Sequence, residues 1–182
     1  MNYPNKKEHK NKTYIEYGNR GMTLESDINS SNCYYLDNDI AVIYKKPTPI
    51  KAVKVNYTKT RITEAYYEIP STTDYNGIYK GKYIDFEAKE TRSKTSFPII
   101  NIHKHQIDHL ERVNKHGGIS FIIIRFTTLN KTFLILTKDF VDYFKNNNKK
   151  SIPISYIEEK GFLIKDGYNP IIDYLNIVDK LI

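Results

Sequence analysis

The sequence contains no tryptophan and only one cysteine, Cys33, among its 182 residues. A single cysteine excludes a disulfide within the chain and a zinc site built from several cysteines. No apolar run reaches the roughly 20 residues that cross a bilayer. Residues 1–12 are polar and basic, without the apolar core of a signal peptide. We therefore expect a cytoplasmic protein with no membrane partner.

Internal repeats and long low-complexity segments are also absent from the sequence. A chain of this length then fits one domain with a buried core and one active site. We expect this single domain to span residues 17–182. Residues 1–16 lack periodicity and are rich in lysine and asparagine, which predicts a mobile basic arm.

Positive charge is in excess, with 28 Lys and Arg against 21 Asp and Glu, a formal net charge of +7. This balance favours a polyanionic partner. DNA, RNA and an anionic membrane surface would all attract such a protein, so charge alone does not choose among them.

Helical and strand patterns are mixed along the chain. Apolar spacing predicts a first helix ending near Asn38, a helix over residues 103–116 and a final helix over residues 170–181. Residues 119–126 form an apolar run typical of a strand buried on both faces, and residues 132–137 look like its neighbour. The mixture predicts an α/β fold with a mixed β-sheet flanked by helices.

Residues 50–69 alternate β-forming side chains with basic and polar ones, which predicts a two-stranded projection turning near residues 58–61. Lys45 and Lys46 precede it, next to two prolines that stiffen the chain. We expect residues 45–69 to form a projecting basic stalk that contacts phosphates. A solubilising charged loop would show the same pattern.

The candidate catalytic residues lie between positions 71 and 89, where we expect a hairpin that turns near Lys80 and Gly81. Strand alternation places Asp85, Glu87 and Lys89 on one face of its second strand. Asp74, on the first strand of this hairpin, would then approach Glu87.

Two close carboxylates repel each other unless a cation lies between them, and hard oxygen ligands favour Mg²⁺, with Mn²⁺ as a substitute. Such a metal acidifies a nucleophilic water and offsets charge on a scissile phosphate. Lys89 would stabilise the transition state as a point charge, and Thr72 would add an oxygen ligand. The competing interpretation is a solvated charged face in which Glu87 and Lys89 merely pair.

Asp74 followed by Glu87, Ala88 and Lys89 resembles the motif of the PD-(D/E)xK nuclease superfamily, with Thr73 where its proline often stands. The likeness extends to residues 19–25, 45–49, 71–81 and 85–91, which resemble the RecU-type Holliday junction resolvases. It covers the chain from about Tyr17 onward. The resemblance implies a restriction-endonuclease-like core and a homodimeric bacterial enzyme that makes paired cuts in four-way junctions during recombination and repair.

The resemblance also implies roles for single residues. Thr72, Asp74, Glu87 and Gln106 match the family's magnesium positions, and Lys89 matches its transition-state stabiliser. By its position alone, Gln106 would be an ordinary surface residue.

The predicted stalk corresponds to a family stalk that enters the central opening of the junction. Arg61 near its tip, and Lys45 and Lys46 near its base, are then candidate DNA contacts. Arg20 lies where the first helix begins and is a further candidate for holding phosphate. Glu25 either faces the metal cluster or is an ordinary surface charge.

His105 and His109 have the i, i+4 spacing that can bind zinc on a helix. Gln106, and not glutamate, follows the first histidine, so the metalloprotease pattern is incomplete. We expect these histidines to lie on a solvated helix face.

These observations favour a Mg²⁺-dependent junction-resolving endonuclease, acting as a homodimer on four-way junction DNA, with recombination proteins as further candidate partners. One alternative is a repair or restriction-like nuclease that cuts duplex or flap DNA. The other is a non-catalytic structural DNA-binding or strand-annealing protein.

Overall fold

The computed structural model describes residues 23–59, 61–67, 72–147 and 149–182. Its centre is a six-stranded sheet with the strand order β1-β4-β5-β7-β8-β10. The strands are β1 Val42–Lys45, β4 Tyr75–Tyr79, β5 Lys82–Thr91, β7 Ile119–Phe126, β8 Lys131–Leu136 and β10 Phe162–Ile164. β5 and β7 run parallel, whereas the other neighbours are antiparallel. The expected mixed sheet is therefore confirmed.

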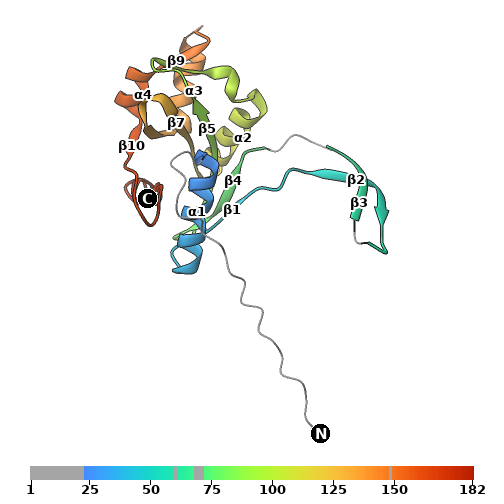
Figure 1. Cartoon of the computed structure of the whole chain (residues 1–182). Helices are drawn as coiled ribbons and strands as arrows, with labels where there is room; N and C mark the ends of the chain where they lie inside the picture. Colours follow the sequence, from blue (N-terminus) through green and yellow to red (C-terminus); the bar gives the residue numbers. More distant parts are fainter. Residues whose placement is uncertain (1–22, 60, 68–71, 148) are drawn as a thin grey trace.

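Helices cover both faces of this sheet (Figure 1). α1 Leu24–Asp37 and the short α5 Leu175–Val178 pack on one face, and α2 Lys104–Lys115, α3 Thr137–Asn146 and α4 Ile154–Lys160 on the other. β7 joins the two cores, because Phe121 and Ile123 face α1 while Ile122 and Ile124 face α2. This alternation is the burial on both faces that the apolar run predicts.

Shorter elements complete the α2 side. β6 Ser96–Pro98 pairs with β9 Ser151–Pro153, and two single 3₁₀ turns, η1 Ile99–Asn101 and η2 Thr127–Leu129, link the longer elements.

α2 has the caps that its sequence requires. His103 and Gln106 form a reciprocal capping box at its start, in which the His103 N–H donates to Gln106 Oε1 at 2.9 Å. Gly117 follows its end with a φ of 84°, a left-handed conformation that glycine adopts without steric cost. The helix therefore begins at a fixed residue, which in turn fixes which side chains face the sheet.

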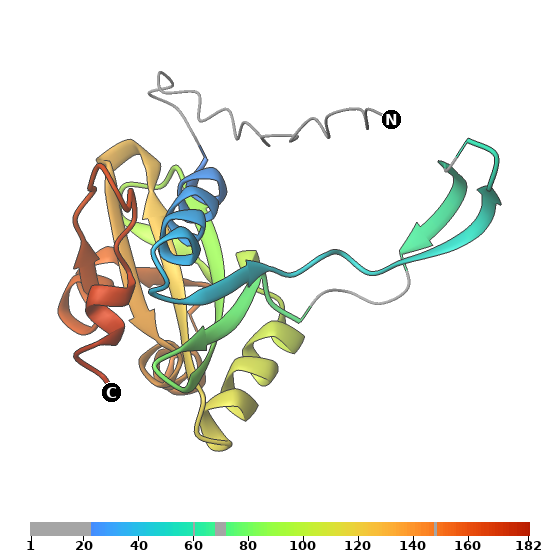
Figure 2. The same ribbon diagram turned by 90° about the horizontal axis from the view of Figure 1, so that it is seen from below.

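A separate hairpin of β2 Ile50–Asn56 and β3 Arg61–Tyr67 extends away from the body (Figures 1 and 2). Every residue of both strands is exposed. The predicted two-stranded projection is present, with its turn at residues 57–59 as far as the chain is described there.

Two expectations of local structure are wrong. The final helix of residues 170–181 is reduced to the single turn of α5, because the preceding chain bonds elsewhere. Gly167 N–H donates to Ile171 O at 2.8 Å, and Ile172 N–H donates to Ser31 Oγ at 2.9 Å. In addition, β4 begins at Tyr75, so Thr72 and Asp74 lie just before this strand and not on it.

The expected mobile arm of residues 1–16, and Arg20, lie outside the described residues. Within the described ranges, none of the helices is both long and apolar enough to span a membrane.

Candidate active site

β5 presents a polar face toward α2 and an apolar face toward α1. Ile84 and Phe86 belong to the α1-side core, and Phe86 stacks between Tyr75 and Phe121 at ring-centroid distances of 4.9 and 4.8 Å. The intervening Asp85 and Glu87 are fully buried on the other face. Packing of the aromatic face therefore fixes the position of both carboxylates along β5 and the direction in which they point.

Asp74 reaches Glu87 through the register of the β4–β5 hairpin, in which Tyr75 pairs with Phe86. The Asp74 N–H donates to Glu87 Oε2 at 3.1 Å. In return, Asp74 Oδ2 accepts from the Ala88 N–H at 3.2 Å. The two acidic residues are thus held side by side by backbone hydrogen bonds.

Lys89 closes this group. Its ammonium forms an ion pair with Glu87 Oε1 and lies 3.3 Å from Asp74 Oδ2. About a quarter of the side chain, 27%, is exposed, so Lys89 lies at the border between the buried carboxylates and solvent. The structure therefore brings Asp74, Glu87 and Lys89 together.

The charges of this group are strongly perturbed. Burial, and then the Asp74 carboxylate, raise the pKa of Glu87 to about 8, although Lys89 opposes the shift. Burial works against the charged form of Lys89, but the Glu87 and Asp74 carboxylates outweigh it and raise the pKa of that lysine. Two carboxylates in this setting favour a bound cation.

α2 adds Gln106, which is buried and not at the surface as its position alone suggests. Its Nε2 donates to Glu87 Oε1 at 2.8 Å, while its Oε1 accepts from the His103 N–H. In this conformation the amide presents nitrogen, and not oxygen, to the carboxylates. Turning the amide over would direct its oxygen inward at the cost of the capping bond.

Thr72 lies at the outer side of the group and is exposed. Its hydroxyl accepts from Lys46 Nζ at 3.1 Å. Lys46 also contacts Thr73 and lies 2.8 Å from Asp85 Oδ2. Thr72 is thus joined to the site through a lysine.

His109 departs from the expectation of a solvated helix face. Its Nε2 lies 3.0 Å from Asp85 Oδ2, and 28% of its side chain is exposed. His109 follows Gln106 by one helical turn, so both side chains project onto the polar face of β5. Neither Asp85 nor His109 was expected to contribute; the signal that could have found them is this shared spacing on strand and helix.

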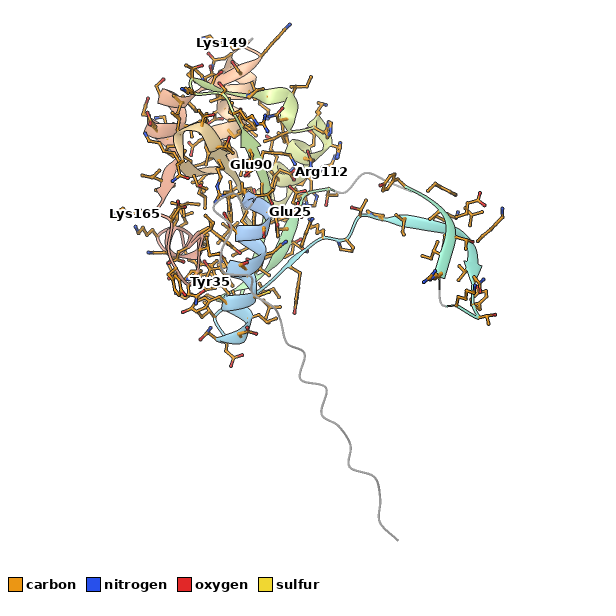
Figure 3. The ribbon with its side chains drawn as sticks, in the orientation of Figure 1. Glu25, Tyr35, Glu90, Arg112, Lys149 and Lys165 are labelled. Carbon is orange, nitrogen blue, oxygen red and sulfur yellow. The ribbon has the colours of Figure 1, made fainter. Side chains whose placement is uncertain are left out.

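Glu25 lies on α1, near Glu90 of β5 (Figure 3). Its carboxylate pairs with Lys45, and its carbonyl accepts from the Tyr75 hydroxyl at 3.3 Å. Burial, followed by the negative charges of Glu25 and Asp74, raises the pKa of Tyr75. Glu25 is therefore close enough to influence the edge of the site electrostatically.

The family model described as "Recombination protein U" matches residues 19–180. The chain belongs to this family. It is 55% identical over 172 residues to the Holliday junction resolvase RecU of Pediococcus pentosaceus, covering 91% of this chain and 86% of that protein. It is 50% identical over 200 residues to the Holliday junction resolvase RecU of Staphylococcus aureus, covering 100% of this chain and 96% of that protein.

Among solved structures, the chain is similar to Hjc, a Holliday junction resolvase from Archaeoglobus fulgidus, with a TM-score of 0.44 and 11% identity. The match covers 76% of this chain and 91% of that one. The predicted membership of the RecU-type family is confirmed by the family model and the curated relatives.

Membership of the RecU family implies a divalent metal requirement. Among the described residues, no group of three or more His, Cys, Asp and Glu side chains could hold a metal ion. A site here would therefore use the two carboxylates with hydroxyl and amide oxygens. Burial, and then the Asp74 carboxylate, raise the pKa of Glu87, and a bound cation would favour its charged form against both effects.

The candidate DNA contacts of this RecU-family chain are dispersed. Arg61 is exposed on the hairpin. Lys45 pairs with Glu25, and Lys46 points inward with 15% of its side chain exposed. Their proposed contacts with DNA remain predictions.

Proposed function

We propose that this protein is a Mg²⁺-dependent endonuclease that resolves four-way DNA junctions by paired nicks during recombination and repair. One observation carries the chemistry: Asp74, Glu87 and Lys89 converge, with two carboxylates and a lysine ammonium within hydrogen-bonding contact. Family membership supports the choice of junction DNA over other nucleic acids.

Asp74 and Glu87 would hold the cation, with Thr72 and Gln106 as additional oxygen donors. Mg²⁺ tolerates this small protein set because it usually retains several waters. When bound, it would acidify the attacking water and offset charge on the scissile phosphate. Gln106 would take part once its amide turns its oxygen toward Glu87.

Lys89, whose side chain is partly exposed, would direct its ammonium at the scissile phosphate. A fixed cation at that place stabilises the charge that grows as the fifth oxygen adds, and costs no reorganisation during the reaction. Its ion pair with Glu87 keeps the side chain directed at the site in the free protein.

The β2–β3 hairpin would act as the stalk that contacts junction DNA, with Arg61 on its outer part. Lys45, Lys46 and Arg20 would also contact phosphates. Exposure of every described hairpin residue supports such a role, since the side chains are free to reach a partner.

A homodimer suits the substrate, since a four-way junction has two-fold symmetry and a two-fold dimer places one site on each of two opposed strands. Recombination proteins remain candidate partners. A cytoplasmic location, where bacterial chromosomal DNA is found, is part of the same proposal.

The test is cleavage of a labelled immobile four-way junction, with a matched duplex, by wild type and Asp74→Asn in Mg²⁺ or EDTA. We expect metal-dependent paired nicking of the junction that the substitution abolishes while binding persists. Equal cutting of the duplex would favour a repair or restriction-like nuclease. Junction binding by wild type without cutting in Mg²⁺ would favour the structural or strand-annealing alternative.

A further inference from the structure

Asp85 is a buried carboxylate outside the proposed metal ligands, two positions before Glu87 on the same face of β5. Four side chains surround it. They are Lys46 at 2.8 Å, the Tyr83 hydroxyl at 2.9 Å, His109 Nε2 at 3.0 Å and the Thr73 hydroxyl. A buried carboxylate requires such partners, because an unpaired one would be strongly destabilising.

Two of these partners come from the two roots of the β2–β3 hairpin. We define the outgoing root as residues 46–49, after β1, and the returning root as residues 72–74, before β4. Lys46 is the first residue of the outgoing root, and its ammonium contacts the hydroxyls of Thr72 and Thr73 in the returning root. The Lys46 N–H also donates to Asp74 O at 2.8 Å. The roots are thus tied to each other.

Asp85 connects these roots to the rigid part of the molecule. Within the sheet it is paired with Asn76 of β4 and Ser120 of β7. Through His109 it also contacts α2, the helix that carries Gln106. One buried side chain therefore links both hairpin roots to the strand and the helix that build the active site.

We infer that Asp85 is a positioning residue: with Lys46 and His109 it sets the direction of the β2–β3 hairpin relative to the Asp74–Glu87–Lys89 group, and so helps select junctions over duplexes. The inference rests on the proposed role of this hairpin as the DNA-contacting stalk. Because the hairpin extends away from the body in Figure 2, contacts that hold its two roots together would set its direction. A fixed direction places the branch point at a fixed distance from the cutting site.

The direct test measures the distance between the hairpin and the body in the DNA-free protein by pulsed double electron–electron resonance. Cys33, the only cysteine and exposed on α1, takes one spin label. Thr58→Cys in the hairpin turn takes the other. Dilution with unlabelled Cys33→Ser chains restricts the signal to distances within one chain.

We compare wild type, Asp85→Asn, Lys46→Met, their combination, and Lys131→Met as a control that breaks the exposed Lys131–Glu158 pair. Wild type and the Lys131→Met control should each give one narrow distribution of distances. Asp85→Asn and Lys46→Met should each give a broader one. The combination should be no broader than either single variant, because both remove the same contact. Lys46→Met, at a partly exposed position, serves if Asp85→Asn does not fold. Unchanged distributions in the folded variants would overturn the inference.

The second readout is the ratio of kcat/KM for junction over matched duplex. Asp85→Asn should lower this ratio by roughly tenfold or more, since ångström-scale misplacement of a substrate has large effects on rate. A purely structural role would lower melting temperature and active fraction but leave the ratio unchanged, and that result would overturn the selectivity claim. Absence of junction cleavage by wild type would refute the proposed function, whereas the distance distribution would still decide whether Asp85 holds the hairpin.

Discussion

At the scale of single residues, the proposed role of Lys89 in cleavage depends on its ammonium group. It lies beside Glu87 and Asp74 with an exposed edge, so it can meet a phosphate without moving far. Removing the ammonium would take away the charge that we propose stabilises the transition state, but would leave the carboxylates in place. This separates its effect on cleavage from its effect on binding.

We expect Lys89→Met to reduce junction cleavage by about 10²–10³-fold, the range seen when one such stabilising group is lost. Binding, measured in Ca²⁺ or EDTA, should change little. Lys89→Arg should recover only part of the rate, because the guanidinium is larger and differently shaped. Lys82→Met, on the exposed start of the same strand, is the matched control. Full activity of Lys89→Met would show that this lysine has no part in the reaction.

Glu87 should make the metal-free protein sensitive to pH. Its pKa is raised from an ordinary value of 4.5 to about 8, so between these values the folded state holds a proton that the unfolded state has lost. Stability then falls as pH rises through this window.

We therefore predict that wild type in EDTA loses stability between pH 5 and pH 8, relative to Glu87→Gln, as measured by urea denaturation. Mg²⁺ should restore stability at the high end, because it binds the ionised carboxylate. Glu158→Gln, an exposed position, should follow wild type. Parallel curves for wild type and Glu87→Gln would contradict the assignment of the raised pKa.

At the scale of elements, strand alternation correctly predicts which side chains of the candidate site share one face of β5. The period of two in residues 83–89 separates Phe86 from Glu87, and the expected hairpin brings Asp74 to the second strand. The alternation within one strand suffices for this prediction, because one face of β5 must be apolar.

Contacts between elements could not be predicted in this way. Gln106 and His109 lie over β5 because α2 packs there, and nothing within residues 103–116 says which face of the sheet receives the helix. Only the family resemblance pointed to Gln106. The prediction of the final helix was wrong for a related reason. The Ile172 N–H donates to Ser31 of α1, which is distant in the sequence, instead of forming a hydrogen bond within a local helix.

The β2–β3 hairpin is a two-stranded element with every described residue exposed, and such hairpins are only marginally stable alone. A bound partner would therefore stabilise the hairpin. We expect Arg61→Ala to weaken binding to a four-way junction more than binding to a duplex, in titrations at one salt concentration. Lys131→Ala on the body should affect neither. Equal losses on both DNAs would argue against a specific role for the hairpin at the branch point.

For the whole molecule, a net charge of +7 and dispersed basic residues predict binding dominated by phosphate contacts. The logarithm of the junction association constant should fall linearly with the logarithm of salt concentration, by roughly 0.9 for each phosphate neutralised. Arg61→Ala should reduce this slope by about one for each chain of the complex. A flat salt response would contradict nucleic acid as the partner.

The proposed assembly has two active sites, one per chain, which cut two opposed strands of one junction. Extrusion of a cruciform from a supercoiled plasmid provides such a junction, and paired cuts linearise the plasmid whereas a single cut relaxes it. Wild type in Mg²⁺ should give linear DNA. Mixed dimers carrying one Asp74→Asn chain should give nicked circles, because one site is silent. Linear product from mixed dimers at the wild-type rate, or nicked circles alone from wild type, would contradict paired cutting by a two-site dimer.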